Sequence, residues 1–186
     1  MVKLKKLSCW LILFFGIYFV ASGCWIPAKA LLSQHLLKRA WSQSQVSGQI
    51  VKPWPWADSW PVARLVQERL DIDLIVLEGG SGEVLAFGPG HLPHSGRPGL
   101  GGHCILAGHR DTSFKFLKNI KPGDSLKVEG HGGAVTYQVR GREIVAADNL
   151  YLNSEADGFL TLVTCYPFDT VIPGGELRLI VTAERV

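Results

Sequence analysis

The chain has 186 residues, of which 47% are hydrophobic and 19% are charged, and it shows no fixed repeat. This length supports one domain with a single core, and the composition excludes a collagen-like chain, a repeat array and a disordered polymer. The net charge is +3, but four lysines and no acidic residue fall within the first 30 residues, which leaves 15 basic and 16 acidic side chains in the rest. A near-neutral body lacks the basic surface that binds nucleic acid.

The N-terminal segment has the pattern of a membrane anchor. Residues 1–6 form a basic tail, and residues 7–28 contain no charged side chain. As a helix this run crosses the hydrocarbon core of a bilayer, about 30 Å thick, with Trp10 and Trp25 near its two ends. We therefore predict a single-pass transmembrane signal anchor in the inner (cytoplasmic) membrane, in contact with lipid, with the body on the periplasmic or extracytoplasmic side.

Two processing alternatives remain open for this segment. Residues 28–30 (Ala-Lys-Ala) have the small-x-small form of a signal peptidase site, although the apolar run is longer than in a usual signal peptide. Residues 21–24 (Ala-Ser-Gly-Cys) resemble a lipoprotein processing box. An intact anchor is the preferred interpretation.

Residues 29–60 connect the anchor to the body. Apolar side chains recur with helical spacing from Leu31 to Trp41 and predict an amphipathic juxtamembrane helix that ends near Ser44. A segment rich in tryptophan and proline follows, from Pro53 to Pro61. Its three tryptophans are expected to pack against the domain rather than to form a ligand platform.

Residues 61–186 alternate short apolar runs with glycine and proline breaks, which predicts a mainly β domain. The candidate strands are residues 62–66, 71–77, 83–87, 103–107, 125–129, 135–146, 159–164 and 176–182. Only residues 113–119 and a few short turns are expected to be helical. About eight strands in this length favour a closed or nearly closed β-barrel. Because side chains fill the interior of a small barrel, we expect the chemistry at strand ends or in loops.

The four cysteines divide into two pairs. Cys9 and Cys24 lie in the apolar segment, whereas Cys104 and Cys165 lie in the body. No CxxC pair occurs, which argues against a zinc ribbon and a thioredoxin-type motif. The body cysteines either form a structural disulfide, which an exported compartment allows, or include a free nucleophile. Cys165 follows a predicted strand and looks presented to solvent, whereas Cys104 looks like a small buried apolar residue.

A histidine and an arginine are predicted to lie near Cys165. His109 follows the strand at residues 103–107, so a parallel pairing with the strand at 159–164 places His109 and Cys165 at one rim of the barrel. A hairpin return brings Arg178 beside Cys165. A thiolate attacks a carbonyl carbon, an imidazole protonates the leaving amine, and a guanidinium orients the carbonyl and stabilises the oxyanion.

Three segments carry a family resemblance. Residues 161–165 (Thr-Leu-Val-Thr-Cys) look like the TLxTC signature of the sortases, which are membrane-anchored cysteine transpeptidases. Residues 107–110 (Ala-Gly-His-Arg) and 178–181 (Arg-Leu-Ile-Val) resemble the segments that hold the catalytic histidine and arginine of that family. The tryptophan- and proline-rich segment and the compact length are most similar to the sortases of Gram-negative bacteria (the proteobacterial class).

The resemblance implies an eight-stranded sortase-type barrel at residues 61–186 and a complete mechanism. Cys165 attacks the Thr-Gly bond of an LPxTG-like sorting signal and forms a thioacyl enzyme, while His109 acts as general acid and then base and Arg178 holds the substrate and the oxyanion. Thr164, Tyr166 and His94 are the candidate substrate-binding or oxyanion residues. The implied partners are surface proteins that carry the signal and an amine acceptor, with slow hydrolysis as a side reaction.

Metal and cofactor motifs are weak in this sequence. His91 and His94 have ligand-like spacing but no identifiable third and fourth partner, and the acidic residues at 111, 148, 155 and 157 form no compact array for calcium. We expect neither a metal nor a cofactor. Two other functions remain open: a different exported cysteine transpeptidase or peptidase, and a non-catalytic barrel that binds peptides.

Overall fold

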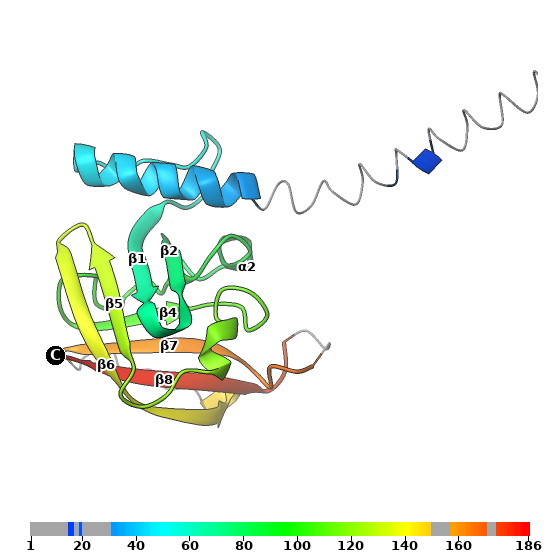
Figure 1. Cartoon of the computed structure of the whole chain (residues 1–186), viewed down its shortest axis with the longest axis vertical. Coiled ribbons are helices and arrows are strands. Elements are labelled where there is room, and N and C mark those ends of the chain that lie inside the picture. Colours follow the sequence, from blue (N-terminus) through cyan, green and yellow to red (C-terminus); the bar gives the residue numbers. More distant parts are fainter. Residues whose placement is uncertain (1–14, 17–18, 20–30, 150–156, 171–173) are drawn as a thin grey trace, which may run out of the picture. The chain divides into compact units, whose positions relative to one another are not determined.

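The computed structural model describes residues 15–16, 19, 31–149, 157–170 and 174–186 (Figure 1). The chain divides into two compact units, Met1–Leu36 and Leu37–Val186. The predicted basic tail and nearly all of the predicted anchor at residues 7–28 lie outside the described residues. Within the described ranges, no helix combines the length and the hydropathy that a membrane crossing requires.

Residues 31–47 are helical, three residues beyond the predicted end. Leu37 and Trp41 lie one helical turn apart and form a buried cluster with Ile75, Leu77 and Val84, all within the second unit. Leu37 is only 1% exposed. The helical residues from 37 onward are therefore part of the folded domain.

The domain is a closed barrel of eight strands (Figure 1). The strands are β1 (Pro61–Gln67), β2 (Ile72–Glu78), β3 (Gly90–His91), β4 (His103–Ala107), β5 (Ser125–Gly130), β6 (Gly133–Ala146), β7 (Phe159–Tyr166) and β8 (Leu177–Arg185). Around the barrel their order is β1-β2-β3-β4-β7-β8-β6-β5, and β5 pairs with β1 to close it. The short helices are η1 (Glu68–Leu70), α2 (Gly82–Leu85), η2 (Lys115–Lys118) and η3 (Ala147–Asn149). The predicted β-barrel is confirmed.

One of the eight predicted strands was wrong. Residues 83–87 do not form a strand, because Ser81 caps a helical turn there and its hydroxyl accepts a hydrogen bond from the Val84 amide at 3.4 Å. The eighth strand is instead the two-residue β3, which pairs in parallel with β2 and antiparallel with β4. The number of strands was predicted correctly, but one of the eight was placed in the wrong residues.

The pairing of β4, β7 and β8 brings distant parts of the sequence together. β4 and β7 are parallel, with His103 opposite Phe159 and Ala107 opposite Val163. β7 and β8 are antiparallel along their whole length, and Figure 1 shows them side by side in orange and red. Both pairings agree with the arrangement predicted from the sequence.

The interior of the barrel is a continuous apolar core. Residues on β4, β7 and β8 enter it at every second position, as the pleat of a strand requires. These are Cys104 and Leu106 on β4, Leu160 and Leu162 on β7, and Leu179, Val181 and Ala183 on β8. The intervening side chains on these strands therefore belong to the outer face of the barrel.

The tryptophan-rich segment lies beside a cavity of about 350 Å³ that Leu37, Leu77 and Val84 also line. The Trp54 ring makes an edge contact with the Phe87 ring, with 5.1 Å between centroids, as expected for a packing role. Trp56 is different, because 79% of it is exposed. The packing prediction therefore describes Trp54 and not Trp56.

Candidate active site

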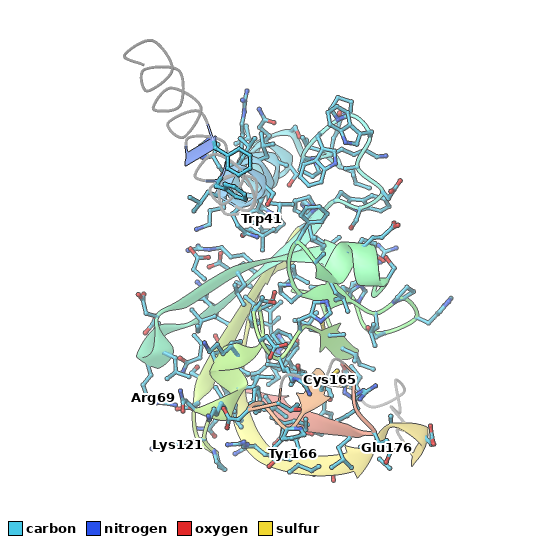
Figure 2. All side chains as sticks on the ribbon, turned by 90° about the vertical axis from the view of Figure 1, so that its right-hand side faces the viewer. Trp41, Arg69, Lys121, Cys165, Tyr166 and Glu176 are labelled. Carbon is cyan, nitrogen blue, oxygen red and sulfur yellow. The ribbon has the colours of Figure 1, made fainter. Side chains whose placement is uncertain are left out.

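Cys165, His109 and Arg178 share the outer face of the barrel near the ends of three neighbouring strands. Cys165 and Arg178 alternate with the interior residues of β7 and β8, so their side chains lie on the outer face. When the alternation of β4 is continued two residues past its end, His109 also falls on the outer face. The three candidate residues therefore lie at strand ends, as expected from the sequence, and on the outer face of the barrel. Figure 2 shows Cys165 and Tyr166 at the C-terminal end of β7.

Cys165 and Arg178 are direct register partners across β7 and β8. Side chains opposite each other on one face of an antiparallel pair have β-carbons about 4.5–5.5 Å apart. Both residues are half-buried. The Arg178 Nη1 donates hydrogen bonds to the carbonyl oxygens of Gly175 (2.8 Å) and Leu177 (2.9 Å), so its own strand and the preceding loop fix the guanidinium.

His109 reaches this face because the parallel alignment of β4 and β7 continues past the end of β4. The Gly108 amide donates to the Val163 carbonyl at 3.1 Å, which keeps the chain in register up to the residue before His109. The Thr164 hydroxyl donates to the Gly108 carbonyl at 2.7 Å. After the turn, the Phe114 amide donates to the His109 carbonyl at 2.9 Å. His109 is exposed, so its imidazole is open to a substrate bound on this face.

The two body cysteines are both free thiols and face opposite sides of the wall. A disulfide between Cys104 and Cys165 is therefore wrong. Cys104 is 1% exposed, and burial raises the pKa of its thiol to about 12. A thiol that stays protonated at neutral pH is a poor nucleophile, which leaves Cys165 as the reactive candidate of the pair.

The other candidate residues are less closely grouped. Thr164 is buried at 2% exposure, with its hydroxyl directed to Gly108. Tyr166 packs against the barrel core, and its ring makes an edge contact with the Phe168 ring. His94 lies in the loop after β3, which runs beside β4 away from His109, since the Gly96 amide donates to the His103 carbonyl. The structure does not bring His94 together with Cys165.

A comparison with protein families matches residues 65–186 to the sortase domain. The chain belongs to the sortase family. Sortase D of Bacillus subtilis (strain 168) is 32% identical over 121 residues, which cover 63% of this chain and 60% of that protein. The chain thus matches less than two thirds of the length of this curated relative.

Solved sortase structures resemble the barrel. Sortase C-1 from Actinomyces oris has a TM-score of 0.58 and 32% identity, covering 68% of this chain and 72% of that one. Sortase C1 of Streptococcus agalactiae has a TM-score of 0.59 and 29% identity, covering 68% and 67%. A Clostridium perfringens sortase D5 transpeptidase has a TM-score of 0.63 over 83% and 98% of the two chains, but at 20% identity it supports the fold alone.

In this sortase, one residue near the site was not predicted. Arg110 directly follows His109, and its side chain is only 4% exposed. The sequence offered a signal, because an arginine next to a candidate catalytic histidine is a charge that must be either solvated or paired. Within the described part of the chain, no group of three or more histidine, cysteine or acidic side chains is arranged to hold a metal ion.

Proposed function

We propose that this sortase is a membrane-anchored cysteine transpeptidase that cleaves an LPxTG-like sorting signal between Thr and Gly and transfers the acyl group to an amine. Its clients are then surface proteins that carry such a signal. The observation that supports the proposal most strongly is the pairing of Cys165 with Arg178 on the outer face, beside the strand end that carries His109.

The proposed reaction has two halves. The Cys165 thiolate attacks the carbonyl carbon of the Thr residue, and the resulting oxyanion is stabilised by the Arg178 guanidinium. Collapse of this intermediate breaks the Thr-Gly bond, and His109 donates a proton to the leaving amine, which leaves a thioacyl bond on Cys165. The incoming amine gives a proton to His109 as it attacks the thioester, which forms a new amide and releases the Cys165 thiolate. Water in place of the amine gives hydrolysis.

The remaining candidate residues have supporting roles in this proposal. Thr164 acts through its hydrogen bond to Gly108, which orients the segment before His109. Tyr166 borders the peptide path directly after the nucleophile. A contact between His94 and the substrate remains a prediction without support from the geometry.

A thioacyl adduct on Cys165 is the direct test of this function. The full chain in detergent micelles is mixed with LPxTG-like peptides and a glycine-based amine, and intact-mass and peptide-map spectra are recorded. The expected result is an adduct of the N-terminal peptide fragment on Cys165 that an amine discharges into a longer product. Cys165→Ala should abolish both products, whereas Cys104→Ala is the matched control and should retain them. If no motif variant yields an adduct on Cys165, the proposed peptide specificity is wrong.

We also propose the cellular setting. The uncharged run at residues 7–28 supports a single-pass inner-membrane anchor. Three lysines precede the run and Lys29, Lys38 and Arg39 follow it, so the placement of the barrel on the extracytoplasmic side rests mainly on the sortase family and not on the charge difference. The tryptophan- and proline-rich segment supports the class found in Gram-negative bacteria. Protease added to spheroplasts should digest the barrel and spare residues 1–6, and protection of the barrel until the membrane is lysed would refute this orientation.

A further inference from the structure

Arg110 places a buried guanidinium directly beside the candidate active site. Its Nη1 donates to the Gly174 carbonyl at 3.3 Å, and its Nη2 donates to the Thr170 carbonyl at 3.4 Å. The Nε lies 3.6 Å from a carboxylate oxygen of Asp111, which is itself 66% exposed. One side chain therefore holds two points of the connection between β7 and β8.

The chemistry of this contact favours an arginine. Burying a charged group is costly unless several acceptors replace its water, and carbonyl oxygens of the connection supply that replacement here. A planar guanidinium reaches two separate acceptors with two nitrogens in fixed geometry, whereas a lysine ammonium acts as a single point charge. The buried arginine is thus suited to fixing one backbone segment against another.

Two adjacent glycines, Gly174 and Gly175, connect Arg110 with Arg178. Gly174 accepts from Arg110, and the adjacent Gly175 accepts from the Arg178 Nη1 at 2.8 Å. Both glycines have left-handed backbone conformations, with φ of 76° and 99°. A β-carbon added to Gly175 would lie 3.4 Å from the Tyr166 carbonyl oxygen and 4.0 Å from the Arg110 Nη1. Gly175 therefore lies close to Arg110 and to the residue after Cys165, while both glycines remain exposed to solvent.

We propose that Arg110 is a positioning residue that sets the place of Arg178 relative to Cys165 and His109 through the Gly174 and Gly175 carbonyls. It links the β4 end, which carries His109, to the start of β8, which carries Arg178. The catalytic consequence of this role rests on the transpeptidase function proposed above, whereas the fixing of the backbone does not.

A double-mutant cycle with Arg110→Gln and Arg178→Gln tests the proposal. Full-length variants are assayed for peptide transfer at a temperature at which circular dichroism shows each of them folded. Arg110→Gln should lower kcat/KM by about 10- to 100-fold, since small misplacements of catalytic groups have effects of this size. In the Arg178→Gln background the same change should cost no more than about 2-fold, because groups that act through one another are not additive. If Arg110→Gln does not fold, the double-mutant cycle is measured with Arg110→Lys in its place.

The matched control is Lys118→Gln. Lys118 holds the same connection from the surface, through Asp169 at 2.8 Å, but the two side chains are 51% and 80% exposed. Such pairs contribute little, so we expect less than about a 2-fold change in kcat/KM. An equally large loss in this variant, or losses at Arg110 and Arg178 that simply multiply, would overturn the proposal.

Hydrogen exchange provides a readout that needs no substrate. Arg110→Gln should speed amide exchange in residues 174–178 while leaving β1 and β5 unchanged, and Lys118→Gln should not. If the unaltered chain forms no thioacyl adduct but this exchange pattern holds, the proposed function fails and the positioning role stands. If the chain is active and exchange in residues 174–178 does not respond to Arg110→Gln, the positioning role is wrong.

Discussion

Replacing Thr164 by valine removes one buried hydroxyl without changing the shape of the side chain. Thr164 is 2% exposed, and its hydroxyl donates to the Gly108 carbonyl at 2.7 Å. Loss of a partner that leaves a buried acceptor less well satisfied costs about 1–3 kcal/mol. For a domain of this size that corresponds to a fall in Tm of about 2–4 °C per kcal/mol.

The same variant should also lose activity, because Gly108 precedes His109. A carbonyl released from its donor allows the chain at His109 to shift, and a displacement of a fraction of an ångström is expected to lower kcat by about 10-fold. The stability change is measured by urea unfolding, and the kinetic change by peptide transfer at saturating substrate. Thr164→Ser keeps the hydroxyl and should retain most of the turnover.

Thr161 provides the matched control on the same strand. Thr161 is equally buried, and its hydroxyl lies 2.7 Å from the Nε2 of His103. His103 is the first residue of β4, whereas His109 follows the last one. Thr161→Val should therefore cost a similar amount of stability, about 1–3 kcal/mol, and leave kcat within about 2-fold. If Thr164→Val and Thr161→Val lose stability equally and also retain turnover equally, the hydrogen bond to Gly108 does not position His109.

Two further predictions concern stability. Burial raises the pKa values of both Cys104 and Tyr137 to about 12, so the unfolded chain releases these protons at lower pH than the folded chain does. The free energy of unfolding should therefore fall as the pH rises from about 9 towards 12. Urea unfolding at a series of pH values should show a smaller fall for Cys104→Ala. An equal fall in this variant would contradict the assignment to Cys104. Leu37→Ala should cost about 2–5 kcal/mol, because it opens a cavity between the helix and the barrel. Val46→Ala, at a side chain that is 90% exposed on the same helix, should have little effect, and equal effects of the two changes would show that the helix does not support the barrel.

The sequence predicted the strands β4, β7 and β8 well because their signals are local. Short apolar runs define β4, β7 and β8, and glycine and proline lie at their ends. Residues 160–164 of β7 are buried on both faces, so the sequence alone does not show which way Cys165 points. The outward orientation follows from the barrel core, which contains Leu160 and Leu162.

The mistakes came from short segments whose structure depends on distant residues. Residues 83–87 have a β-favouring composition, but the Ser81 cap and the burial of Val84 select a helical turn. Strand β3 has only two residues and exists because β2 and β4 lie on either side of it. The role of Arg110 depends on Gly174, 64 residues away, and no local pattern encodes such a contact.

The parallel pairing of β4 with β7 has a consequence for how the chain folds. Thr164 and Gly108 are 56 residues apart in sequence, and β5 and β6 form between them. Contacts over such separations close late, because the entropy of the intervening chain is lost before they contribute any stability. Cys165 and His109 therefore come together only when the barrel is nearly complete. On the function proposed above, an incompletely folded chain has a free thiol but no assembled site, and acyl transfer is confined to molecules that have finished folding.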